Sequence, residues 1–110
     1  MLFINTEDFF AQASAVVRLS RDEEQTLARQ MATGDDAARE DLIRSQFPLV
    51  AAYIRKAPPQ VQTLQAVYAC IAIVEAAVDR FSFQQSGETF AHHLGWQLRK
   101  CINDQLLDKL

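Results

Sequence analysis

The stretch of sequence that decides the fold is LSRDEEQTLARQMATGDDAAREDLI, residues 19–43. Ser20 and Glu23 have the spacing of a capping box, in which the serine oxygen accepts from a first-turn amide and the glutamate accepts from the serine amide. A helix is therefore predicted from Arg21 to Ala32. Gly34 is predicted to end it, because glycine enters the left-handed conformation without penalty.

The helical pattern resumes directly after this glycine. Asp35 or Asp36 is predicted to cap the next helix, whose apolar positions continue to Ile54. Pro48 lies inside the pattern, where it removes one backbone donor and clashes with the preceding turn. A kink is therefore predicted at this proline.

Further helical patterns lie on both sides, and almost no alternating β-branched run suggests a strand. Thr6 is predicted as the N-cap of the first helix, whose apolar stripe contains Phe9 and Phe10. Pro58-Pro59 marks the clearest loop, and a polar turn is predicted at 82–87. The flanking helices are predicted at 6–19, 60–81 and about 88–107. The expected fold class is all-α, a compact bundle of about five helices forming a single domain over residues 1–110.

Charge is distributed unevenly along the chain, whose net charge is −3. Residues 1–47 carry nine acidic and five basic side chains, whereas residues 48–87 carry two and three. Proteins that bind nucleic acid by themselves usually concentrate Lys and Arg in one patch, because phosphate neutralisation supplies most of the affinity. Tight DNA binding by this chain alone is therefore not expected.

Several functional classes lack their sequence signals. The chain has no basic leader and no apolar run of about 18 residues, so we expect a cytoplasmic protein that does not enter a membrane. Cys70 and Cys101 lie within helical patterns without zinc-ligand spacing, so buried, reduced thiols and no metal or cofactor are expected. Neither a Gly-rich phosphate loop nor a nucleophile–base arrangement suggests an enzyme.

The order of the elements carries a family resemblance. A capped helix, the break Gly34-Asp35 and a helix beginning Ala38-Arg39-Glu40-Asp41-Leu42-Ile43 follow one another without gaps. Ala77-Val78-Asp79-Arg80-Phe81 then ends the long middle helix with a basic-Phe pair, and the last helix carries Phe90, Trp96, Leu98, Arg99 and Ile102. The series resembles region 2 of bacterial RNA polymerase sigma factors, with the preceding helix of region 1.2. Residues 20–107 are the region 2-like part, and 6–19 are an extra N-terminal helix.

The resemblance implies a regulator of transcription initiation. Its expected partner is the RNA polymerase core or a second sigma-like subunit, and promoter DNA is expected to be bound only within that complex. Because the chain as given carries no helix-turn-helix to read the −35 element, a complete sigma factor is not expected, and the region 2 half of a split sigma factor is the alternative within the same family.

The last helix of the family captures unstacked bases of the melted −10 element on aromatic side chains, since every base offers a π-face. His92 and His93 replace Thr and Tyr here, Trp96 matches the first of two tryptophans, and Gln97 replaces the second. A Trp and a His in such a helix are also common as core or boundary residues. The implied DNA-binding residues are His92, His93, Trp96, Gln97, Arg99 and Lys100, of which the last two would meet phosphate.

The middle helix departs further from the family. There, a polar Asp-Leu-x-Gln-Glu-Gly pattern contacts the clamp of the largest polymerase subunit, whereas residues 65–70 of this chain read QAVYAC. The same charged contact is therefore not available. The expected contacts with polymerase or a partner are Gln65, Tyr68, Ala69, Ala72, Ile73 and Ala76.

Two alternatives stay open for this apolar side of the middle helix. Either it is exposed and needs a partner, or the helix at 6–19 covers it. The second functional hypothesis follows from the lost polar pattern: a degenerate sigma-like interaction module, acting as a homodimer or by binding a regulator, without promoter activity.

Overall fold

The computed structural model describes residues 2–80 and 90–108, and every regular element in these ranges is a helix. The expected all-α class is therefore confirmed. The elements are α1 (Thr6–Ser14), α2 (Arg21–Ala32), α3 (Asp36–Ser45), α4 (Phe47–Lys56), the short 3-10 helix η1 (Pro59–Val61), α5 (Leu64–Arg80) and α6 (Phe90–Asp108).

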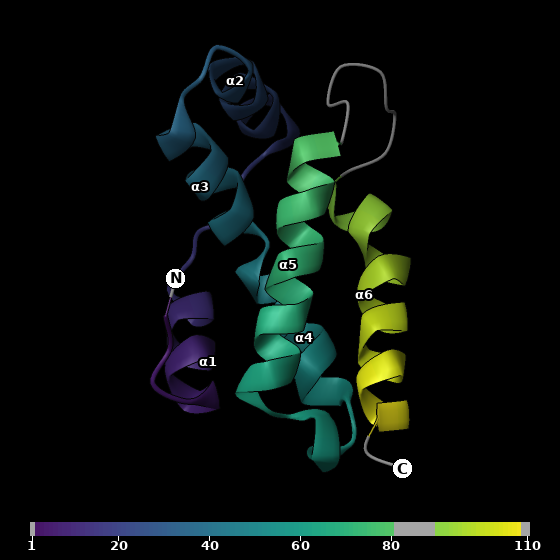
Figure 1. Ribbon diagram of the computed structural model, residues 1–110. Coiled ribbons are helices and arrows are strands. Elements are labelled where there is room, and N and C mark those ends of the chain that lie inside the picture. Colours follow the sequence, from purple (N-terminus) through teal and green to yellow (C-terminus); the bar gives the residue numbers. More distant parts are fainter. Residues whose placement is uncertain (1, 81–89, 109–110) are drawn as a thin grey trace.

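Helix α5 runs through the middle of the molecule (Figure 1). Helix α4 lies behind it, α6 runs antiparallel along one side, and α1 and α3 lie on the other side, with α2 packed on α3. The apolar side chains of α3 to α6 converge into one core, in which Leu42, Ile54, Val67 and Leu94 are fully buried. The radius of gyration of 14.0 Å is close to the value of about 13 Å expected for a compact chain of this length.

The local signals in residues 19–43 act as predicted. The Ser20 hydroxyl accepts the Glu23 amide at 3.1 Å, and the Glu23 carboxylate accepts the Ser20 amide at 2.9 Å. Gly34 has a φ of +96°, in the left-handed region. The Asp35 carboxylate then accepts the Ala38 amide at 3.1 Å, so Asp35 caps α3.

The predicted boundaries of the first helix are wrong. Asn5, not Thr6, is the N-cap: its side chain accepts the Asp8 amide at 2.8 Å, while the Asp8 carboxylate accepts the Ile4 amide at 3.0 Å. The helix ends at Ser14 instead of Leu19. The Ser14 hydroxyl donates to the Ala11 carbonyl, and the β-branched residues Val16 and Val17, which follow Ala15, have low helix propensity.

The predicted kink at Pro48 is a complete division of the pattern into α3 and α4. Gln46 separates them, and Pro48 occupies the first turn of α4, where its missing amide costs nothing. Gln46 is buried, and its side-chain amide donates to the Ser45 hydroxyl at 3.0 Å. The break lets the two short helices turn their apolar sides toward the same core.

The middle helix begins later than the predicted residue 60. After η1, the Thr63 hydroxyl accepts the Ala66 amide at 3.2 Å and starts α5 at Leu64. The Gln62 side chain donates to the Ala57 carbonyl at 2.9 Å and so satisfies the end of α4. The predictions for residues 81–89 lie outside the described residues, and α6 is described from Phe90 to Asp108.

Candidate functional site

Helix α6 presents one exposed face with Trp96 at its centre. We call it the Trp96 face; its members are His92, His93, Trp96, Gln97, Arg99 and Lys100, which the sequence singled out for DNA contact. At about 100° per residue, these six positions lie on one side of the helix. The Trp96 side chain is 65% exposed, so its alternative interpretation as a core or boundary residue is wrong. Its indole ring is available for stacking.

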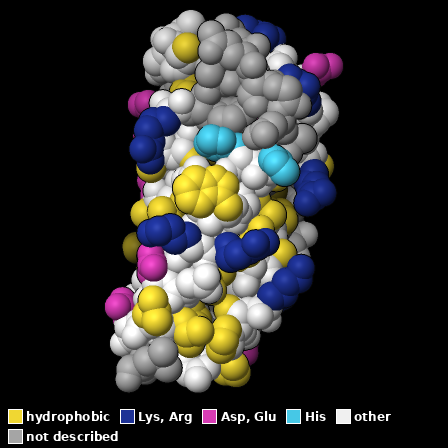
Figure 2. Space-filling model, turned by 90° about the vertical axis from the view of Figure 1, so that its right-hand side faces the viewer, with side chains coloured by type: hydrophobic (Ala, Val, Ile, Leu, Met, Phe, Trp, Pro, Cys, Tyr) yellow, Lys and Arg dark blue, Asp and Glu magenta, His cyan; other side chains and the backbone are white. Residues whose placement is uncertain are grey.

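Cationic side chains surround this indole. Arg99 and Lys100 are exposed one turn after Trp96, and Figure 2 shows both histidines and several Lys and Arg side chains on this side of the molecule. The Lys100 ammonium lies 3.3 Å from the Asp104 carboxylate in an exposed ion pair. Such a pair contributes only about 0–1 kcal/mol. Lys100 can therefore exchange this carboxylate for a phosphate at little cost.

The two histidines differ in their surroundings. His92 is exposed, whereas His93 is half-buried and its ring stacks on buried Phe90, with centroids 6.4 Å apart and planes at 21°. His93 precedes Trp96 by three residues on α6, so the contact with Phe90 holds the His93 ring about one helical turn before the indole. Within residues 2–80 and 90–108, no three His, Cys, Asp or Glu side chains are grouped as metal ligands would be.

A groove of about 480 Å³ between α4 and α6 adjoins the Trp96 face. Arg99 belongs to both, and from α4 the groove receives Tyr53 and Lys56. Close approach of the helices is possible because residue 95 is glycine: a Cβ there would lie 3.0 Å from the Tyr53 hydroxyl. Sequence reasoning missed Tyr53 and Lys56. The only signal was a basic pair ending the helix before Pro58, and it gave no indication that Lys56 lies near Arg99.

The residues predicted to contact polymerase or a partner share one side of α5. We call this set the α5 face; it consists of Gln65, Tyr68, Ala69, Ala72, Ile73 and Ala76. Gln65, Tyr68 and Ala72 are exposed, and the other three are half-buried. The opposite side of α5 is buried in the core through Val67, Cys70, Ile71, Val74 and Val78.

Helix α1 covers only the beginning of the α5 face. Phe9 is fully buried against Phe47 of α4, with ring centroids 5.7 Å apart. The preceding segment reaches Tyr68, whose hydroxyl accepts the Phe3 amide at 2.9 Å. Ala72 stays exposed one turn further along α5. Of the two alternatives for this face, complete cover by the first helix is therefore wrong.

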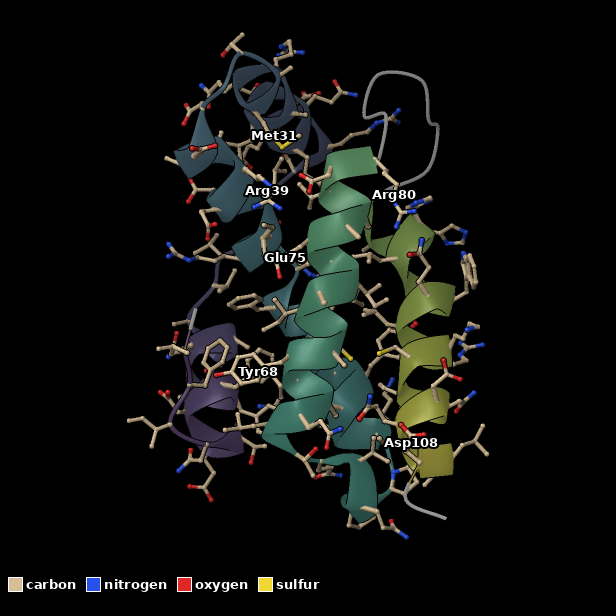
Figure 3. The ribbon with its side chains drawn as sticks, in the orientation of Figure 1. Met31, Arg39, Tyr68, Glu75, Arg80 and Asp108 are labelled. Carbon is tan, nitrogen blue, oxygen red and sulfur yellow. The ribbon has the colours of Figure 1, made fainter. Side chains whose placement is uncertain are left out.

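An ion pair borders the far end of the α5 face. Arg39 of α3 donates from Nε and Nη2 to the two carboxylate oxygens of Asp79, at 2.8 and 3.0 Å. Figure 3 shows Arg39 beside Glu75 of α5. The two hydrogen bonds from Arg39 lower the pKa of Asp79 and raise the pKa of Arg39. This partly exposed bridge joins α3 to α5 at the rim of the core.

Comparisons with protein-family models, curated proteins and solved structures give no match for this chain. Over the described residues, none of the helices combines the length and apolarity needed to cross a membrane.

Proposed function

We propose that this chain is a sigma region 2-like subunit that acts by binding, not by catalysis. Its α5 face binds the RNA polymerase core or a second sigma-like subunit in the cytoplasm. Its Trp96 face captures the bases of the melted −10 element once that complex has formed. In this proposal the −35 element is read by another protein, as in a split sigma factor.

The observation that supports this function most strongly is the exposure of Trp96. An indole that is 65% exposed loses little by leaving water for a base, and a base stacked on an aromatic side chain contributes about 1–3 kcal/mol. Arg99 and Lys100 lie one helical turn away, where they can meet the phosphates beside a stacked base. An aromatic platform with adjacent cations is the arrangement that single-stranded nucleic acid requires.

Charge explains why promoter DNA would be bound only within an assembly. The chain has a net charge of −3, and its excess of acids lies in residues 1–47. The few cations of the Trp96 face and the groove release few counterions, so their binding to DNA is weak alone. A partner docked on α5 would supply the remaining affinity by holding the Trp96 face at the promoter.

Co-purification with RNA polymerase at low salt tests this proposal. Wild-type chain should retain polymerase or a sigma-like subunit, Ala72→Arg should lose it, and Trp96→Ala should keep it while promoter-dependent transcription falls about 5- to 150-fold, the equivalent of one lost stack. Leu107→Ala is the matched control, because Leu107 is an equally exposed apolar residue of α6, at 64%. Failure to retain polymerase, together with unchanged transcription for Trp96→Ala, would refute the proposal.

The α5 face favours a second candidate function. Its centre contains no charged side chain, and three alanines leave room for close approach of another helix. A sigma-like interaction module without promoter activity, forming a homodimer or binding a regulator, would use the same face. Mass measurement in solution separates the two: a dimer that Ala72→Arg converts to monomer favours this module, and a wild-type monomer favours the sigma-like role.

A further inference from the structure

The only two cysteines of the chain meet across the contact between α5 and α6. Cys70 is fully buried in the core-facing side of α5, and Cys101 is half-buried on α6. Cys70 is part of the core cluster on α5, Cys101 packs against that cluster from α6, and the two thiols interact there. Residues 70 and 101 are distant in sequence, so only the packing of these antiparallel helices joins them (Figure 1).

The packing around the pair holds the sulfurs together. On α6, Leu98 and Ile102 flank Cys101 and are buried in the core. On α5, Val67 and Val74 do the same for Cys70, one turn before and one turn after it. Sliding or rotation of either helix would expose these aliphatic side chains, so packing keeps the two cysteines on the facing sides of α5 and α6.

The two thiols have different reactivities. The interaction with the Cys70 thiol, with a smaller contribution from Lys100, lowers the pKa of Cys101 to about 7, although burial and Asp104 act in the opposite direction. The pKa of Cys70 is raised by the same interaction and by burial. A half-exposed thiolate is the nucleophile that oxidants attack, and a buried thiol at its side is placed to react second.

We propose that Cys101 and Cys70 form a peroxide-responsive modification site that closes to a disulfide between α6 and α5. The Cys101 thiolate attacks one oxygen of hydrogen peroxide, the O–O bond breaks, and hydroxide leaves, so that Cys101 becomes a sulfenic acid. The Cys70 sulfur then attacks the Cys101 sulfur, the S–O bond breaks, and the hydroxyl leaves as water with the proton of Cys70. Two thiols are oxidised, and the peroxide is reduced to two molecules of water after protonation of the hydroxide.

This site does not depend on the function proposed above. Disulfides formed in a reducing cytoplasm are usually transient and belong to sensing or catalytic sites. Reduction by a small dithiol would reverse the bond. The bond would join the helix that bears the Trp96 face covalently to the helix that bears the α5 face.

Thiol counting after peroxide treatment tests the inference. Reduced wild-type chain, dilute and monomeric, is treated with hydrogen peroxide, denatured and labelled with a maleimide, and its mass is measured. Labelled thiols should fall from two to none per chain, and digestion should yield one peptide pair joined through Cys70 and Cys101. Dithiothreitol should restore both thiols.

Two variants separate the roles of the cysteines. Cys101→Ser should keep its remaining thiol reduced, because Cys70 is buried. Cys70→Ser should give a sulfenic acid at Cys101 that dimedone traps. Two reduced thiols in treated wild-type chain that is folded by circular dichroism would overturn the inference, and so would disulfides that join separate chains. The linked-peptide result on wild-type chain decides the matter if either variant fails to fold.

Discussion

The burial of Phe9 leads to the strongest prediction about stability. Phe9 is 0% exposed and packs edge-on against Phe3, with ring centroids 5.2 Å apart, and against Phe47 at 5.7 Å. Truncation to alanine removes the buried ring and leaves a cavity, which costs about 3–5 kcal/mol at such sites. A chain of this size loses about 4 °C in melting temperature for each kcal/mol, so Phe9→Ala should lower it by about 12–20 °C.

Phe10→Ala is the matched control for this prediction, one residue further along the same helix. Phe10 is half-buried, and the Arg55 guanidinium lies 4.6 Å from its ring centroid. Loss of partial burial and of an exposed cation–π contact should cost only about 1–2 kcal/mol.

Urea unfolding followed by circular dichroism provides the assay for both variants. A fall in the slope m for Phe9→Ala would show that α1 detaches while the remaining helices stay folded. Equal losses for Phe9→Ala and Phe10→Ala, or a loss below about 1 kcal/mol for Phe9→Ala, would refute the view that α1 is anchored on α4 through this ring.

The remaining predictions concern single interactions, each measured by urea unfolding. Ser20→Ala removes the hydroxyl that accepts the Glu23 amide and should cost about 1 kcal/mol; an unchanged midpoint would mean that the box contributes nothing. Gly34→Ala places a side chain at a φ of +96° and should cost about 1–2 kcal/mol, and Gly34→Asn should cost less; equal losses would argue against strain as the cause. Asp79→Asn should cost at most about 1 kcal/mol at neutral pH, because the pair with Arg39 is partly exposed. The pKa of Asp79 is lowered in the folded state, so the bridge stabilises fully above the ordinary value of 3.8 and is lost as the pH falls below it. A wild-type advantage that persists well below that pH would contradict this assignment.

Helix starts and stops that depend on neighbouring residues were predictable from the sequence. The Ser20–Glu23 box, Gly34 and the Asp35 cap each act over at most four positions, and all three appear as expected. Errors arose where two local signals competed. Asn5 and Thr6 are both residue types that cap helices. The pairing with Asp8 decided for Asn5, because the Asn5 side chain accepts the Asp8 amide and the Asp8 carboxylate accepts the Ile4 amide.

The two candidate faces were partly predictable. Helical spacing correctly places the predicted residues of α6 on one side of that helix, and those of α5 on one side of theirs. Spacing alone could not say whether Trp96 faces water or the core, because Phe90 and Leu94 lie nearby in the sequence. Burial of Phe90 and Leu94 on the side facing α5 settled that the indole points outward.

The sequence by itself determined where α2 and α3 begin, which residues share a side of each helix, and that the chain is all-helical, because these properties follow from interactions within a few residues. Only the tertiary structure decided which helices meet. It placed Cys70 against Cys101, Lys56 across a groove from Arg99, and Phe9 on α4 instead of on the α5 face. Such contacts depend on how several apolar surfaces fill one core together, and no local pattern specifies that arrangement.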